Sequence, residues 1–229
     1  FAEHCRAATP LEQMTPVNTL LARHYPVAAA ALRAEEAAAA AANGDQQVRN
    51  CGTIGGALVH ADPASDYPAA ILTDEAEMVV QGPGGSRTVS AADFFVDIFA
   101  TAVQEDELLT AVRVSARAAG TGSAYLKFPN PASGYAVVGC AANVTMDGGK
   151  CASAKVAFNG VANVAFRDAG VEDAITGTGA DAAAIAAAAE CAGNGQECMS
   201  DTFASAEFRA HLAKVYAGRA LAAAVADAS

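Results

Sequence analysis

A glycine-rich stretch followed by two aspartates contains the residues whose types and spacing could do chemistry. In chain order these residues are Gly52, Thr53, Ile54, Gly55, Gly56, Asp62 and Asp66. Glycine lets the backbone adopt positive φ angles and lets a ligand come close to the amide groups. Successive amides form a concavity that binds anions, and the hydroxyl of Thr53 adds a donor. The carboxylate of Asp66 is suited to accept hydrogen bonds from the hydroxyls of a ligand.

Taken alone, this pattern describes a loop for phosphate and sugar groups. Its spacing fits neither the Gly-x-x-x-x-Gly-Lys-Ser/Thr phosphate loop nor the Gly-x-Gly-x-x-Gly dinucleotide fingerprint. A tight structural turn is therefore the competing interpretation of the same glycines.

The composition argues against several classes of function. The chain has 229 residues, a net charge of −11 and a pI near 4.7, and this acidity argues against nucleic acid as a partner, because phosphates require a basic surface. The longest apolar runs are rich in alanine and contain charged residues, so we expect no membrane span. No secretory signal is visible, and we expect a cytoplasmic protein. The six cysteines include no Cys-x-x-Cys pair and the four histidines lack metal-ligand spacing, so we predict no metal site in this chain.

The first half of the chain is expected to combine helices with a β-hairpin. Helices are predicted from Pro10 onward and over residues 27–42, 69–72 and 91–99, and strands over residues 77–81, 87–89 and 107–114. Residues 52–60 are expected to run extended through the glycine loop. The phenylalanines at 94, 95 and 99, together with Ile98, have helical spacing and are expected to form the buried face of the helix at 91–99.

The second half is expected to follow a linker at residues 116–121 and to form an antiparallel sheet with helices on one face. Strands are predicted over 123–128, 135–146 and 152–158, and alanine-rich helices over 168–176, 180–192 and 206–226. The last helix has an apolar stripe of Phe208, Leu212, Val215 and Leu221. The fold class predicted for the chain is α+β.

The glycine loop belongs to a longer series of motifs that runs in order through nearly the whole chain. The motifs are Val48-Arg49-Asn50-x-Gly52-Thr53-Ile54-Gly55-Gly56, Ala61-Asp62-Pro63-Ala64-x-Asp66-x-Pro68-Ala69, Thr88-Val89-x-Ala91-x-Asp93-Phe94-Phe95, Glu107-Leu108-Leu109-Thr110, Ala124-Tyr125-Leu126-Lys127-Phe128, Tyr135-Ala136-Val137-Val138 and Ser205-Ala206-Glu207-Phe208-Arg209. With these motifs the sequence resembles the FAD-binding medium subunit of the molybdenum hydroxylases. That family includes carbon monoxide dehydrogenases, bacterial xanthine dehydrogenases and nicotine dehydrogenases.

The resemblance implies an FAD-binding domain of the vanillyl-alcohol-oxidase (PCMH) type over residues 1–116 and a C-terminal α+β domain over residues 122–229. The family's first flavin loop, an Ala-Gly-Gly-x-Ser-Leu-like motif, has no counterpart, so we expect the N-terminal part of the first domain to be missing from this sequence.

The resemblance also implies which residues bind FAD. The segment Thr53, Ile54, Gly55, Gly56 and Ala57 matches the part of the family motif that contacts the pyrophosphate and nearby flavin atoms. Asp66 matches the position that binds sugar hydroxyls, and Leu109 and Lys127 match positions that line the cofactor cleft. Tyr135 matches a tyrosine that shields the isoalloxazine in some members. From the residues alone, Leu109 could equally be core, Lys127 a surface residue with a buried stem, and Tyr135 an ordinary strand aromatic.

The function implied by the resemblance is electron transfer within an oxidoreductase complex. A large molybdopterin-binding subunit oxidises the substrate, a small subunit relays electrons through [2Fe-2S] clusters, and FAD passes them to NAD, a quinone or oxygen. No side chain of this subunit is required as a catalyst, and a heterohexamer is the family's expected assembly. Two alternatives are kept: a flavin-free structural subunit of the same fold that docks the partner subunits, and a different FAD enzyme on this fold.

Overall fold

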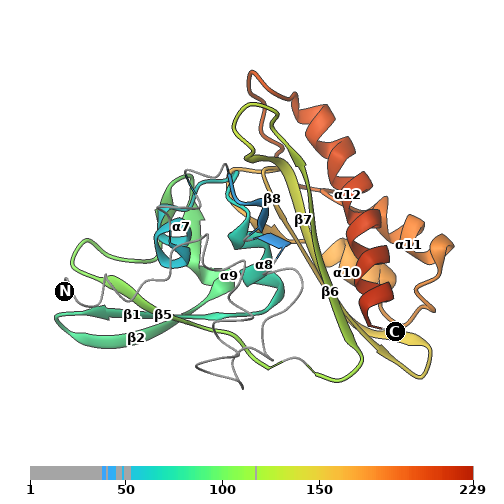
Figure 1. Cartoon of the computed structure of the whole chain (residues 1–229), viewed down its shortest axis with the longest axis horizontal. Coiled ribbons are helices and arrows are strands. Elements are labelled where there is room, and N and C mark those ends of the chain that lie inside the picture. Colours follow the sequence, from blue (N-terminus) through green and yellow to red (C-terminus); the bar gives the residue numbers. More distant parts are fainter. Residues whose placement is uncertain (1–37, 40, 45–47, 49–52, 117, 229) are drawn as a thin grey trace.

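The computed structural model of the chain describes residues 38–39, 41–44, 48, 53–116 and 118–228 (Figure 1). The helix predicted from Pro10 lies outside these residues, as does most of the helix predicted at 27–42. Within the latter, Ala38, Ala39, Ala41 and Ala42 are helical. Gly44 follows with a φ of 50°, in the left-handed region that commonly ends a helix.

Two short helices follow the glycine loop, α7 (Ile54–His60) and α8 (Tyr67–Thr73). The prediction that residues 52–60 run extended is therefore wrong for the described residues from Ile54 onward. Thr53 is an N-cap whose side chain accepts a hydrogen bond from the amide of Gly56 at 3.0 Å. Leu58 is fully buried and anchors this turn of helix on the core. The cap and the buried leucine outweigh the low helix propensity of the two glycines.

Three antiparallel strands form the first sheet: β1 (Glu77–Gly82), β2 (Gly85–Ser90) and β5 (Leu108–Arg113), in the order β2-β1-β5. The sheet extends to the left in Figure 1. The predicted hairpin and the later strand are both confirmed. A tight turn links Gly82 to its register partner Gly85.

The helix predicted at 91–99 ends early. Ser90 caps α9 (Ala91–Phe94), and the chain then turns into β3 (Phe95–Asp97), which pairs with β4 (Ala100–Thr101). Phe94 and Phe95 are buried as predicted, but 42% of Ile98 and 55% of Phe99 are exposed. The backbone becomes extended at Phe95, so the helical spacing that placed all four side chains on one face no longer applies.

A second antiparallel sheet forms the centre of the molecule. It contains β6 (Thr121–Pro129), β7 (Ala136–Asp147), β8 (Lys150–Asn159) and β9 (Phe166–Arg167), paired in chain order. The first nine residues of β7 are buried, so this central strand is covered on both faces. Its alanines and Gly139 allow elements on either side to approach closely.

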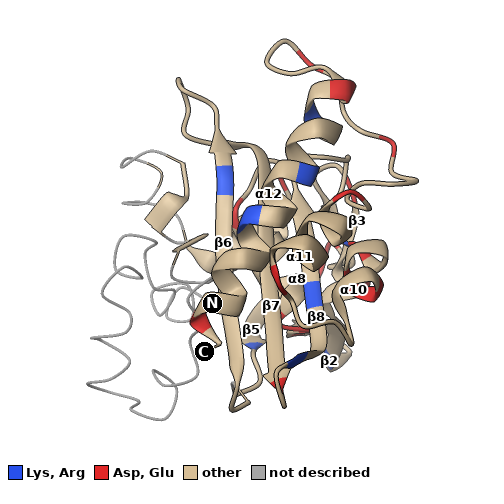
Figure 2. Ribbon diagram, turned by 90° about the vertical axis from the view of Figure 1, so that its right-hand side faces the viewer, with Lys and Arg blue, Asp and Glu red and all other residues tan. Residues whose placement is uncertain are grey.

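Helices α10 (Ala169–Ile175), α11 (Ala182–Ala189) and α12 (Ala206–Asp227) cover one face of this sheet (Figure 2). Asp168, Asp181 and Ser205 are their N-caps, and each side chain accepts a hydrogen bond from a backbone amide. Helix α8 packs on the opposite face, against β7 and β8. The α+β prediction is confirmed, and the sheet lies between helices on both sides.

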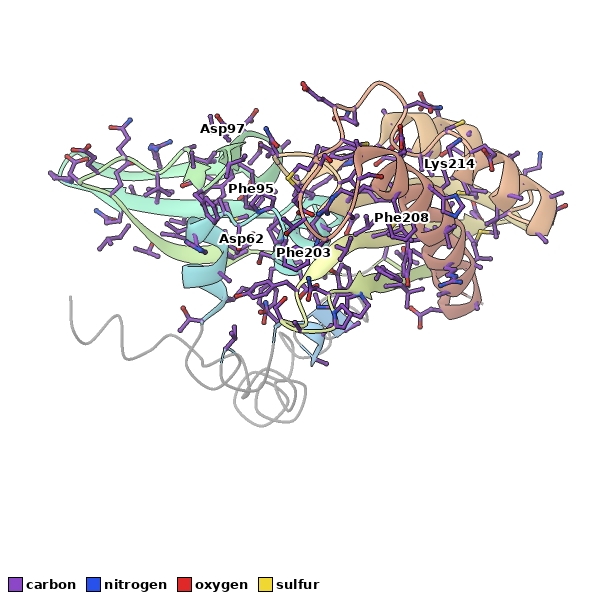
Figure 3. All side chains as sticks on the ribbon, turned by 90° about the horizontal axis from the view of Figure 1, so that it is seen from above. Asp62, Phe95, Asp97, Phe203, Phe208 and Lys214 are labelled. Carbon is purple, nitrogen blue, oxygen red and sulfur yellow. The ribbon has the colours of Figure 1, made fainter. Side chains whose placement is uncertain are left out.

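The predicted apolar stripe of the last helix is only partly correct. Leu212 and Leu221 are buried, whereas 42% of Phe208 is exposed near the start of α12, where Figure 3 labels it. Its ring instead meets Phe128 of β6 edge to face, with centroids 5.9 Å apart. Among the helices that the structure describes, none is long and apolar enough to cross a membrane.

The approach of α12 to β6 depends on a glycine. A side-chain carbon at Gly122 would collide with backbone atoms of Ala224 and Ala228, and the neighbouring amide of Ser123 donates to Asp227 at 3.0 Å. We predict that Gly122→Ala lowers the free energy of unfolding by about 1–3 kcal/mol because helix and strand must separate. Gly84→Ala is the control, because that position faces open space. Equal denaturation midpoints for both variants would contradict the prediction.

Candidate functional site

Asp66 lies at the N-terminus of α8 and is completely buried. Pro68 follows within the first turn of the helix, and the Asp66 side chain makes no capping hydrogen bond. Its carboxylate points instead to β6. The Tyr125 hydroxyl donates to Oδ1 at 2.5 Å, and the Lys127 ammonium donates to Oδ2 at 2.9 Å. The backbone amide of Gly44 is a further donor.

Lys127 joins three separate segments of the chain. Its ammonium group donates to the carbonyl of Ala42 at 2.6 Å, to Asp66, and to the carbonyl of Gly134 at 2.6 Å. These bonds use all three of its hydrogens. Only 9% of the side chain is exposed, so this is a buried ion pair whose ammonium group is fully hydrogen-bonded.

Burial and charge act on Asp66 in opposite directions. Loss of solvent raises the pKa of its carboxyl to about 6, while Lys127 and the hydrogen bond from Tyr125 oppose that rise. The carboxyl is therefore mostly ionised above neutral pH although no water reaches it. A carboxylate offers about four acceptor positions, so three donors leave it with capacity for one more.

The start of α7 has backbone amides that the helix itself does not use. The amide of Gly56 donates to the side chain of Thr53, but helix geometry leaves the amides of Ile54 and Gly55 without an acceptor inside the helix. A side-chain carbon at Gly55 would meet nothing within 4 Å. The Thr53 hydroxyl accepts one hydrogen bond, and among the described residues no acceptor is given for its own hydrogen, which can therefore donate to a ligand. This end of α7 can therefore approach an anionic group.

The remaining predicted residues lie around these two features. Leu109 of β5 is partly buried, and together with Ile54 and Ala57 of α7 it packs against the core cluster that contains α8. Tyr135 is half-buried and immediately precedes β7. Its carbonyl accepts from the amide of Asn130 at 2.7 Å, and the next carbonyl back along the chain, that of Gly134, is bound by Lys127.

The structure thus brings Asp66 and Lys127 into direct contact and connects Lys127 to the loop that positions Tyr135. Asp62 has a local role, because its carboxylate accepts from the amide of Ala64 at 2.9 Å and closes a turn. It also lines a small hollow with Phe95 and Asp97, all three labelled in Figure 3. A second hollow lies beside the β1–β2 turn, and neither contains any of the predicted flavin-binding residues.

Tyr125 and Asn159 were not predicted as site residues. Tyr125 and Lys127 are two residues apart on β6, so their side chains lie on the same face, and strand alternation could have identified the tyrosine. No pattern in the sequence places Asn159, at the end of β8, beside them. Only the pairing of β6, β7 and β8 does so.

Comparisons with known proteins identify the family of the chain. Residues 4–116 match a family described as the FAD binding domain in molybdopterin dehydrogenase, and residues 123–224 match the CO dehydrogenase flavoprotein C-terminal domain. The carbon monoxide dehydrogenase medium chain of Hydrogenophaga pseudoflava is 36% identical over 211 residues, which cover 92% of this chain and 72% of that protein. This chain belongs to the carbon monoxide dehydrogenase medium-chain family. The resemblance inferred from the sequence is confirmed.

Another protein to which the chain is similar is named after a different substrate. The 6-hydroxypseudooxynicotine dehydrogenase complex subunit alpha of Paenarthrobacter nicotinovorans is 34% identical, and the match covers 77% of this chain and 60% of that subunit. A solved structure of the Hydrogenophaga pseudoflava carbon monoxide dehydrogenase, which lacks the Mo-pyranopterin moiety of its molybdenum cofactor, superposes with a TM-score of 0.86. That superposition covers 94% of this chain and 73% of the other, at 36% identity.

The residues present fit FAD. The open position at Gly55 and the hydroxyl of Thr53, whose hydrogen is given no acceptor among the described residues, suit a pyrophosphate. Asp66 has an acceptor position left for a sugar hydroxyl, and because its side chain is completely buried, the residues that cover it must move to admit the sugar. In the described part of the chain, no three His, Cys, Asp or Glu residues gather in a way that could hold a metal ion.

The Asp66–Lys127 ion pair generates a prediction about stability. We expect Lys127→Met to lower the free energy of unfolding by about 3 kcal/mol at about pH 8, because a buried carboxylate would lose its partner. At about pH 5 the loss should be smaller. The carboxyl has a raised pKa of about 6 in the native chain and a higher one in the variant, so it is protonated and neutral there.

Lys155→Met is the matched control. Lys155 pairs with Glu75 at the surface, where 29% and 54% of the two side chains are exposed, and its loss should lower the unfolding free energy by less than about 1 kcal/mol. Denaturant unfolding at the two pH values measures both variants. A loss in Lys127→Met that does not change with pH would contradict the prediction.

Proposed function

We propose that this chain is the FAD-binding electron-transfer subunit of a molybdenum hydroxylase complex. The observation that carries the proposal is the match of its two consecutive segments, residues 4–116 and 123–224, to the two domains of such subunits. The fit of α7 and Asp66 to a dinucleotide supports it. Bound FAD supplies the redox chemistry, and the chain supplies binding, orientation and the electrostatic surroundings.

In this proposal Thr53, Ile54, Gly55, Gly56 and Ala57 hold the pyrophosphate at the start of α7. Asp66 accepts a hydrogen bond from a sugar hydroxyl with the acceptor position that Tyr125, Lys127 and Gly44 leave unused. Lys127 keeps Asp66 charged, and Leu109 borders the cofactor from β5. Tyr135 shields the flavin ring, and its position follows from the bonds that hold Asn130 and Gly134.

The assembly follows from the same proposal. A large molybdopterin-binding subunit oxidises the substrate, and a small [2Fe-2S] subunit carries the electrons to this chain. An external acceptor, NAD, a quinone or oxygen, removes them. The substrate is determined by the large subunit, which agrees with the different substrates in the relatives' names. Six subunits in a heterohexamer and a cytoplasmic location remain predictions.

A flavin-free structural subunit is the second candidate. It is favoured by the saturation of Lys127, whose three hydrogens are all bound by oxygen atoms of this chain. Residues that match a cofactor site thus also hold the fold together, and they would be retained in a chain that binds no flavin.

Isolation of the complex from its native source separates the two candidates. We expect a visible absorption spectrum with flavin and iron–sulfur bands, and mass spectrometry should find a large and a small subunit together with this chain. A complex of the same subunits without any flavin would support the structural role. A colourless chain that purifies alone would contradict both.

Gly55 gives a sharper test of the flavin site. We predict that Gly55→Val leaves the unfolding midpoint of the chain nearly unchanged, because the position is open, but weakens FAD binding at least about tenfold by keeping the pyrophosphate from the amides. Fluorescence titration with FAD measures the affinity. Gly84→Val, at an open position in the turn between β1 and β2, is the control and should bind normally. Unchanged affinity in Gly55→Val would exclude this end of α7 as the pyrophosphate site.

A further inference from the structure

Behind Asp66 lies a line of buried polar groups that crosses the central sheet. Tyr125 of β6 is 4% exposed and Asn159 of β8 is 1% exposed. The tyrosine hydroxyl lies 2.5 Å from Oδ1 of Asp66 and 3.2 Å from Oδ1 of Asn159. Buried polar groups at such distances require a consistent assignment of donors and acceptors.

A glycine in β7 permits this arrangement. Strand β7 separates β6 from β8, and its Gly139 pairs with Lys127 on one side and Asn159 on the other. A side-chain carbon at Gly139 would overlap the tyrosine hydroxyl and the asparagine amide. Glycine at this position therefore lets the two groups meet over the middle strand.

The number of hydrogens on each group determines which group donates and which accepts along this line. The tyrosine hydroxyl has one hydrogen, and an ionised carboxylate can only accept, so the hydrogen goes to Asp66. The tyrosine oxygen is then left to accept, and Asn159 must donate to it. Turning the Asn159 amide by half a turn puts its nitrogen toward the tyrosine. The turn gives that nitrogen, otherwise buried without a partner among the described residues, an acceptor for one of its hydrogens.

We infer that Asn159 and Tyr125 are positioning residues that donate in sequence, amide to hydroxyl and hydroxyl to carboxylate, and thereby hold Asp66 ionised and oriented toward the flavin's sugar. The inference rests on the proposed function for the sugar contact. The orientation of the relay rests on this chain alone. With one oxygen held by Tyr125 and the other by Lys127, the carboxylate cannot rotate, and its remaining acceptor position has a fixed direction.

The charged and titratable groups around Asp66 are few. In the described part of the chain they are Lys127 and Tyr125 on β6, Tyr67 next to it on α8, and the thiol of Cys140 on β7, which acts on Tyr125. Burial and the neighbouring Asp66 raise the pKa of both tyrosines, so neither titrates near neutral pH. Between about pH 5 and 8, the group of this cluster that changes charge is therefore Asp66 itself.

The first test uses the full chain without FAD. We expect Tyr125→Phe to lower the unfolding free energy more at about pH 8 than at about pH 5, because only ionised Asp66 needs the donor. Tyr216→Phe is the matched control. It is a buried tyrosine in the core cluster on the opposite face of the sheet, and its effect should not change with pH. An equal effect of Tyr125→Phe at both pH values would show a packing role and overturn the relay.

A double-mutant cycle tests the part of Asn159. Asn159→Leu should show the same pH-dependent loss in the native background and none in the Tyr125→Phe background, since its effect passes through the tyrosine. If Asn159→Leu lowered the unfolding free energy by the same pH-dependent amount in the Tyr125→Phe background, Asn159 would not be part of the relay.

FAD titration of the same variants tests the positioning role. At about pH 8 we expect Tyr125→Phe to weaken FAD binding roughly tenfold or more, because a hydrogen bond to a charged group is lost. Tyr216→Phe is again the control and should bind FAD with the affinity of the native chain. Normal FAD affinity in Tyr125→Phe would overturn the positioning role. If the native chain itself bound no FAD, the proposed function would fail, and the pH dependence without FAD would still decide whether the relay exists.

Discussion

The buried ion pair of Asp66 and Lys127 is the interaction on which the arrangement of the molecule depends. It connects the N-terminus of α8 to the first strand of the central sheet, and the lysine also binds the carbonyls of Ala42 and Gly134. Segments far apart in the chain thus meet at one ammonium group. Since a buried charge without a partner is strongly destabilising, these segments are held in a single relative position. The same contact positions Asp66 and the loop that contains Tyr135.

The central sheet makes this contact possible because it is covered on both faces. Strand β7 is buried along most of its length, with α12 on one side and α8 on the other. Small residues at the contact points, such as Gly122 under α12 and Gly139 beneath Tyr125, let backbones and polar groups approach where larger side chains would collide. The abundance of alanine and glycine in this sequence therefore has a structural use, since it brings layers close together and leaves room for the polar line behind Asp66.

Two of the motifs identified in the sequence contact each other. Arg209 of the C-terminal motif is buried and donates to the carbonyls of Val137 and Gly160, and its other terminal nitrogen donates to Asp201 at 2.5 Å. It thereby holds the start of α12 against the ends of β7 and β8, next to the loop that contains Tyr135. The C-terminal motif thus helps to place a residue that the proposal assigns to the flavin.

The sequence by itself determined the family, the α+β class, the β1–β2 hairpin and the strands of the second sheet, because these depend on local alternation, turn glycines and motifs that are contiguous in the chain. It could not determine that α7 is helical or that Ile98 and Phe99 are exposed. The conformation of such a short segment depends more on its capping residue and on the surface against which it packs than on its own periodicity. Only the tertiary structure showed that Asp66 accepts from Tyr125, Lys127 and Gly44, and that Asn159 lies behind them. Those contacts join residues on different strands and helices, and their geometry exists only after the sheet has paired and α8 has packed against it.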